Sequence, residues 1–127
     1  MELLADLLIA GPMLFFAGMG AVALARPDRV VERFGIGVDT VPGRAEIRSV
    51  YGGFGLAVAG LLAWAVFTDG RGQLWIRSVV AVACFGMAVG RGLSLLLDRS
   101  TGDATTWRFV ALEAVLAVAL FASHTLR

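Results

Sequence analysis

Apolar residues along this chain are gathered into four long blocks separated by short polar segments. The blocks are Leu3–Ala25, Ile47–Phe67, Leu74–Leu97 and Phe109–Leu126. An α-helix rises about 1.5 Å per residue, so blocks of roughly 18 to 24 residues are long enough to cross a hydrocarbon core of about 30 Å. The pattern predicts four transmembrane helices, over about residues 3–25, 44–67, 74–97 and 106–126.

The composition agrees with this pattern. Hydrophobic residues make up 58% of the 127 residues, and the mean hydropathy is +0.81, which is too apolar for an ordinary soluble domain. The chain starts with acidic residues, Glu2 and Asp6, whereas a secretory signal starts with positive charge, so we expect the first block to be retained as a helix. The expected fold is an all-α, integral membrane four-helix transmembrane bundle, with one domain over residues 1–127.

The charges predict an orientation but no nucleic-acid partner. The eleven basic residues are all arginine and the net charge is +1, so a basic patch for nucleic acid is not expected. With four spans, segments 26–48 and 98–108 share one side and hold seven arginines, against three on the other side. The positive-inside rule then predicts both termini outside the cell and the two arginine-rich loops in the cytoplasm, as for a protein of the bacterial inner membrane.

Two opposite charges interrupt the third and fourth blocks at mirrored positions. Arg91 and Glu113 lie at similar distances on either side of the polar segment 98–105. In an antiparallel hairpin they meet at about the same depth. A charge inside a membrane span is costly and usually marks a partner or a functional site. We therefore expect Glu113 to contact Arg91.

The second block brings further polar groups to the same depth. Arg48, Tyr51 and Gly52 are spaced i, i+3 and i+4, so they share one helix face. Counting from the turn near Gly70, Arg48 mirrors a position close to Arg91. We expect Arg48, Tyr51, Arg91 and Glu113 to form one ligand-binding cluster.

Other residues are assigned structural roles. The spacing of Gly86 and Gly90 allows two helix backbones to approach closely in lipid. Cys84 and His124 are the only residues of their types and are expected to pack rather than to bind metal. No cofactor or metal site is predicted. The structural or interface residues expected are Glu46, Gly52, Gly53, Gly86 and Gly90. Glu46 lies nearer the surface, within reach of Arg44 or Arg108.

Three functional interpretations stay open. The charges form a binding site for a membrane lipid or a small amphipathic anion, held by arginine through bidentate hydrogen bonds. Alternatively, Arg91 and Glu113 form only a register-setting ion pair in a structural or accessory subunit, whose small-residue faces contact a second copy or another membrane protein. In the third interpretation the chain is an enzyme, with Glu113 as general acid or base. No catalytic residue is assigned.

The polar residues also carry a family resemblance. The run Glu46-Ile47-Arg48-Ser49-Val50-Tyr51-Gly52-Gly53 is followed by Gly86-x-x-x-Gly90-Arg91 and by Glu113 in the last apolar block. This arrangement resembles the bacterial DUF4345 family over most of the chain from Gly43 onward. The resemblance implies a small four-helix membrane protein and supports the choice of Glu46, Arg48, Tyr51, Arg91 and Glu113. It implies no reaction.

Overall fold

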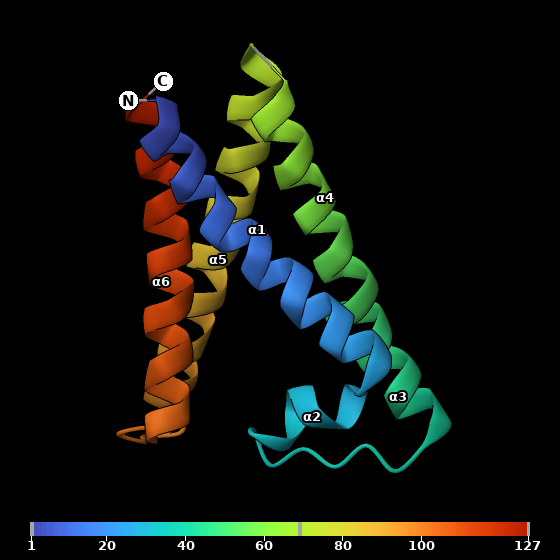
Figure 1. Cartoon of the computed structure of the whole chain (residues 1–127). Helices are drawn as coiled ribbons and strands as arrows, with labels where there is room; N and C mark the ends of the chain where they lie inside the picture. Colours follow the sequence, from blue (N-terminus) through green and yellow to red (C-terminus); the bar gives the residue numbers. More distant parts are fainter. Residues whose placement is uncertain (1, 69, 127) are drawn as a thin grey trace.

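Four long helical segments form the molecule in the computed structural model, which describes residues 2–68 and 70–126 (Figure 1). The helices are α1 (Glu2–Ala25), α2 (Pro27–Glu32), α3 (Val41–Ile47), the π-helix η1 (Arg48–Gly53), α4 (Phe54–Phe67), α5 (Arg71–Leu97) and α6 (Ala104–Thr125). The elements α3, η1 and α4 run on as one span. Four segments are long and apolar enough to cross a membrane, so the chain is an all-α integral membrane four-helix bundle.

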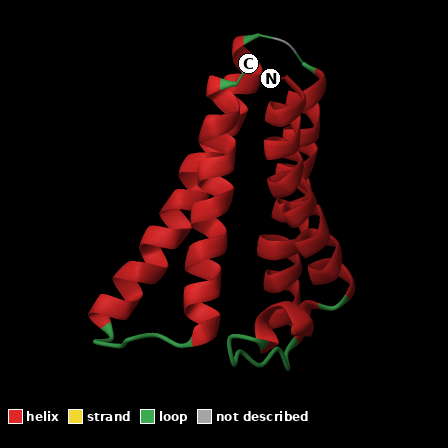
Figure 2. Cartoon of the chain, turned by 60° about the vertical axis from the view of Figure 1, so that its left-hand side comes forward, coloured by secondary structure: helices red, strands yellow, loops and turns green. Residues whose placement is uncertain are grey.

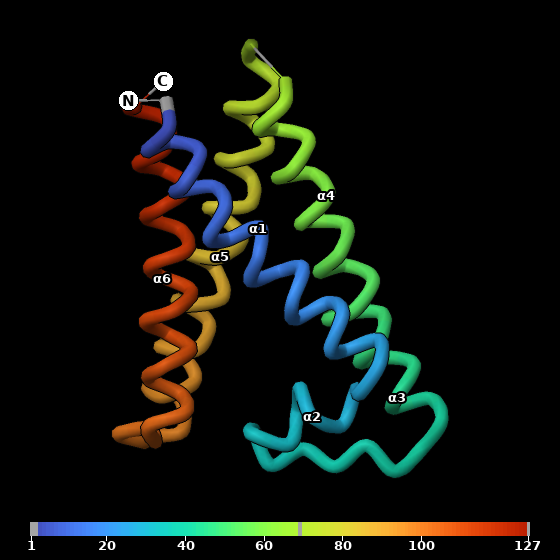
Figure 3. The backbone as a smooth tube through the Cα atoms, viewed as in Figure 1, coloured from blue at the N-terminus to red at the C-terminus, as the bar shows by residue number. Residues whose placement is uncertain are grey.

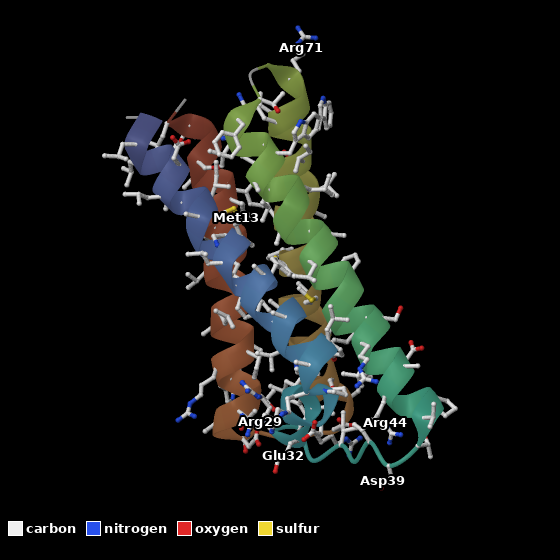
Figure 4. The ribbon with its side chains drawn as sticks, turned by 45° about the vertical axis from the view of Figure 1, so that its right-hand side comes forward. Met13, Arg29, Glu32, Asp39, Arg44 and Arg71 are labelled. Atoms are coloured by element: carbon white, nitrogen blue, oxygen red, sulfur yellow. The ribbon has the colours of Figure 1, made fainter. Side chains whose placement is uncertain are left out.

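The ends of the bundle differ in what they carry. The chain termini and the turn between α4 and α5 lie at one end, which we call the terminal end (Figure 1). The segment 26–40 and the loop between α5 and α6 lie at the other, which we call the loop end. Side chains of Arg29, Glu32, Asp39 and Arg44 gather at the loop end, and Arg71 lies at the terminal end (Figure 4).

Helix α1 crosses the molecule diagonally. It starts beside α6 at the terminal end and packs against the second span, formed by α3, η1 and α4, toward the loop end, where it contacts η1 (Figure 3). The antiparallel helices α5 and α6 pack against each other. This pair and the group formed by α1 and the α3–α4 span separate toward the loop end (Figure 2). The bundle is therefore narrow at the terminal end and wide at the loop end.

The core lies where the helices converge. Side chains such as Ile9, Phe16, Leu62, Cys84 and Leu120 are buried there in one apolar cluster. Large apolar side chains on the outside of the helices are exposed, in keeping with a surface that faces lipid. Cys84 is a packing residue of this core, since its side chain is fully buried.

Glycines set the close crossing of α1 with the second span. A Cβ on Gly20 would lie 2.9 Å from the backbone nitrogen of Leu56, and a Cβ on Gly55 would lie 3.2 Å from the carbonyl oxygen of Phe16. A Cβ on Gly52 would lie 2.7 Å from Leu24 Cδ2. These two helices approach so closely because Gly20, Gly52 and Gly55 have no side chain.

The glycine pair on α5 has no such role within the chain. A Cβ on Gly86 or on Gly90 would meet no atom within 4 Å, and both residues are exposed. Gly53 is likewise exposed. Within one copy of the chain, the spacing of Gly86 and Gly90 therefore does not join two helices.

The short helix α2 at the loop end packs against α1. Its residues Val30 and Val31 are buried against Ala23 of α1, together with the half-buried Tyr51. The short helix α2 folds back under α1 because Pro27 starts a new helix directly after α1 ends. This return places the residues after α2 at the wide end of the bundle.

Candidate functional site

The central polar contact joins α5 to α6. Arg91 Nε lies 3.0 Å from both carboxylate oxygens of Glu113. The Glu113 side chain is 5% exposed and the Arg91 side chain 30% exposed. The two residues meet because the loop between them turns α5 back into an antiparallel α6. The ion pair expected from their mirrored positions is present.

The geometry of this pair leaves part of the guanidinium uncommitted. Only Nε donates to Glu113, although an arginine and a carboxylate commonly pair through two parallel hydrogen bonds. The terminal nitrogens Nη1 and Nη2 of Arg91 donate no hydrogen bond to any residue within 2–68 or 70–126. A planar group with up to four N–H donors is thus available to another acceptor.

Two phenylalanines surround the Arg91 guanidinium. Its Cζ lies 5.1 Å from the ring centroid of Phe109 and 5.4 Å from that of Phe34, and the two rings are 4.9 Å apart. Arg33, next to Phe34, places its own Cζ 6.0 Å from the Phe109 ring. Cations above aromatic faces are attracted to the ring electrons. The rings therefore hold two arginines, Arg33 and Arg91, near one carboxylate, Glu113.

An apolar cavity opens beside this charge cluster. It has a volume of about 410 Å³, within the range of small-molecule pockets. Its charged residues are Arg33, Arg91 and Glu113. Its apolar wall includes Phe15, Phe16, Met19, Val30, Phe54 and Met87. We call it the apolar pocket. It lies where the α5–α6 pair separates from α1 and the α3–α4 span.

The apolar pocket is open toward the outer surface of the bundle. Val22, Val50, Phe54 and Met87 line it and are each more than 40% exposed. Gly18, also exposed, lines it on α1. In a membrane, this surface faces lipid, so an apolar chain can reach the pocket from the bilayer.

The predicted cluster is brought together only in part. Tyr51 lines the apolar pocket with Arg91 and Glu113. Arg48 is exposed, and its Nε donates to the carbonyl oxygen of Leu24 at 3.0 Å. That carbonyl lies in the last turn of α1, where helix carbonyls have no intrahelical partner. Arg48 therefore caps a helix and does not contact Glu113.

The remaining expected residues are peripheral. Glu46 is exposed and forms no ion pair with any residue that the structure describes. Arg44 instead donates to the carbonyl oxygen of Asp39 at 3.2 Å. Gly52 contributes to the crossing with α1, and Gly53, Gly86 and Gly90 face outward.

Sequence reasoning missed three residues of the site: Arg33, Phe34 and Phe109. Arg33 and Phe34 belong to a loop whose path depends on the return of α2, and no periodicity encodes that path. Phe109 gave a weak signal, because it lies one helical turn before Glu113 and so shares its face. The second arginine at the site is therefore Arg33 rather than Arg48.

A second buried polar group lies toward the terminal end. Arg77 is fully buried and donates to the carbonyl oxygen of Ser123 at 3.2 Å and to Gln73 Oε1. These bonds tie α5 to α6 at the end opposite the apolar pocket. Among the described residues, no three His, Cys, Asp or Glu side chains are grouped so that they could hold a metal ion.

Comparison with known proteins identifies a family and no activity. No curated protein matches the chain, and no solved structure matches it. One family model does, described as a domain of unknown function, DUF4345, and it matches residues 4–124. That match covers both halves of the site, from Arg33 to Glu113. The chain belongs to the DUF4345 family.

Proposed function

We propose that this protein binds an amphipathic anion taken from the membrane, such as a lipid with an anionic headgroup. The anionic group would accept hydrogen bonds from Nη1 and Nη2 of Arg91, and the apolar chain would occupy the apolar pocket. The observation that carries the proposal is the free end of the Arg91 guanidinium beside a cavity with apolar walls.

The charge balance of the site supports an anion. Arg33 and Arg91 bring two positive charges against the single negative charge of Glu113. Arg33 forms no ion pair with any residue within 2–68 and 70–126. Charged groups near a low-dielectric region are stabilised by partners. A bound anion between Arg33 and Arg91 would be attracted to both guanidinium groups.

The alternative is a structural or accessory subunit, in which Arg91 and Glu113 only set the register of α5 and α6. In that case a bidentate pair in a filled core is the expected geometry. Instead the contact uses Nε alone, and a cavity of about 410 Å³ adjoins it. These two features favour binding. The outward-facing Gly86 and Gly90 would then be free to contact a second copy or a partner membrane protein.

The third interpretation, an enzyme with Glu113 as general acid or base, has less support. Tyr51 lines the same cavity, but neither its hydroxyl nor Glu113 is bonded to a second proton-transfer group in the part of the chain that is described. The proposal therefore concerns binding.

The proposed site is tested by the lipid that stays bound on purification. Native mass spectrometry would compare the wild type with Arg91→Lys and with Arg48→Lys as the matched control. Lysine keeps the charge but lacks the planar donor group, so Arg91→Lys should lower the bound fraction by roughly tenfold or more, the equivalent of one charge-assisted hydrogen bond. Arg48→Lys should leave it unchanged.

Two results would overturn the proposal. One is a wild-type protein that carries no amphiphile, and the other is an Arg91→Lys variant that binds as much as the wild type. Either result would leave the structural interpretation. Retention of a protein partner in place of a lipid would support the accessory-subunit interpretation directly.

We also propose that the loop end lies in the cytoplasm and the termini outside, in the bacterial inner membrane. Seven of the eleven arginines belong to the segments 26–48 and 98–108, and cytoplasmic loops carry an excess of arginine. The apolar pocket would then open in the cytoplasmic half of the bilayer.

A further inference from the structure

A second cavity adjoins Arg91 on the side of the α5–α6 loop. It measures about 360 Å³, and Ser94, Asp98, Ser100, Asp103 and Thr106 line it together with Arg91. We call it the polar vestibule. Because Arg91 also lines the apolar pocket, its side chain stands between the two cavities. An apolar space and a polar space thus meet at one guanidinium.

The polar vestibule carries negative charge beyond Arg91. Asp98 Oδ2 accepts a hydrogen bond from Ser94 Oγ at 3.2 Å, and its Oδ1 accepts none from any described residue. Asp103 uses Oδ1 for both of its bonds from Thr106. An ionised carboxylate has about four acceptor positions. Both carboxylates therefore keep capacity to accept hydrogen bonds from a ligand.

The order of these chemical environments defines a ligand class. From the bilayer toward the loop they are an apolar pocket, then a cation with free N–H donors, then two carboxylates with hydroxyl groups. Building on the proposed function, we infer that the ligand is a zwitterionic amphiphile, with its anionic centre at Arg91 and a cationic ammonium in the polar vestibule. A simple anionic headgroup would instead place its outer part next to Asp98 and Asp103 without a compensating charge.

The size of the apolar pocket further narrows the class. A cavity of about 410 Å³ is the size of a site for a drug-sized molecule, which suits a single apolar chain. A lysophospholipid with an ethanolamine headgroup has the required order: one chain, a phosphate, and a terminal ammonium. Its phosphate would face Arg91 and its ammonium Asp98 and Asp103.

The inference is tested by titrating the detergent-purified protein with three single-chain lipids in native mass spectrometry. These are lysophosphatidylethanolamine, its N-acetylated form, which lacks the positive charge, and lysophosphatidylglycerol. The wild type should bind the first about tenfold more tightly than the other two, the effect of about 1.4 kcal/mol in affinity. The double variant Asp98→Asn/Asp103→Asn should lose this preference, because only its affinity for lysophosphatidylethanolamine should fall. Asparagine caps a helix as well as aspartate does, so α6 should still form.

The outcomes separate this inference from the proposed function. If all three lipids bind equally, or lysophosphatidylglycerol binds best, the ammonium site is refuted. If the ammonium site is refuted but Arg91→Lys lowers the affinity for all three lipids, the proposed anion site still stands. Binding of none of the lipids, or no effect of Arg91→Lys on any, would refute both. The N-acetyl comparison uses only the wild type, so it decides the question even if the double variant does not fold.

Discussion

The two partners of the central ion pair should differ in what their loss costs. The Glu113 side chain is 5% exposed, whereas the Arg91 side chain is 30% exposed. Removing Arg91 by Arg91→Gln leaves a buried carboxylate without its counter-ion, which costs about 3–5 kcal/mol of unfolding free energy. Removing the charge of Glu113 by Glu113→Gln leaves an arginine that still reaches polar surroundings. The unfolding free energy then falls by about 1.5–3 kcal/mol, the contribution of one charge-assisted hydrogen bond.

This asymmetry is measurable by equilibrium unfolding in mixed micelles, with helicity as the signal. The double variant Arg91→Gln/Glu113→Gln should cost less than the sum of the single variants, because both members of one interaction are removed together. Glu46→Gln is the matched control, since Glu46 is exposed and has no ion pair with a described residue. The reasoning is refuted if Glu113→Gln costs as much as Arg91→Gln, or if neither differs from the control.

Three further predictions concern the fold. Gly20→Ala should destabilise by about 1–3 kcal/mol, because its Cβ would lie 2.9 Å from a backbone atom of the neighbouring helix, while Gly86→Ala, which meets nothing, should not lower the melting temperature. Two hydrogen bonds from Thr106 lower the pKa of Asp103 from its ordinary value of 3.8. The stability that this cap contributes is present above pH 3.8 and is lost as the pH falls through the lowered pKa. In the Asp103→Asn variant, the free energy of unfolding should therefore depend less on pH in that acid range. In a background without the native cysteine, Gly72→Cys and Thr101→Cys should be labelled from opposite sides of the membrane, and labelling from one side would contradict the four-span topology.

Much of the fold follows from the sequence because a bilayer imposes strict rules. A spanning segment must satisfy its backbone hydrogen bonds internally and be about 20 residues long. These rules predict all four spans, although the second, third and fourth begin two or three residues earlier than expected, at Val41, Arg71 and Ala104. The second and fourth begin early because the side chains of Thr40 and Asp103 cap their first turns, and both capping residues lie in segments that the sequence pattern predicts as loops.

The candidate site was predictable only where one hairpin determines it. Arg91 and Glu113 meet because a single short loop fixes the register of α5 and α6. Arg48 was expected beside them on the assumption that the second span packs in regular helical register with the third. A π-helix begins at Arg48, and this segment packs closely against α1 because Gly20, Gly52 and Gly55 have no side chains. The Arg48 side chain thereby reaches the carbonyl oxygen of Leu24 instead.

The glycines illustrate the same limit. Gly86 and Gly90 have the spacing that joins helices in lipid, yet the close crossing uses Gly20, Gly52 and Gly55. A sequence rich in glycine offers many such pairs. Which pair is used depends on the diagonal path of α1, a property of the whole bundle.

The central claim, that the apolar pocket holds the chain of an amphipathic anion, is tested most directly by photo-crosslinking. The probe is a long-chain alkyl phosphate with a diazirine at the end of its chain, added to the purified protein with and without excess unlabelled alkyl phosphate. We predict that the probe labels Met19 and Met87, which line the apolar pocket, and that excess unlabelled alkyl phosphate suppresses this labelling. Labelling that resists competition and falls mainly on outward-facing residues such as Val82 and Val118, which are exposed but do not line the pocket, would contradict the claim.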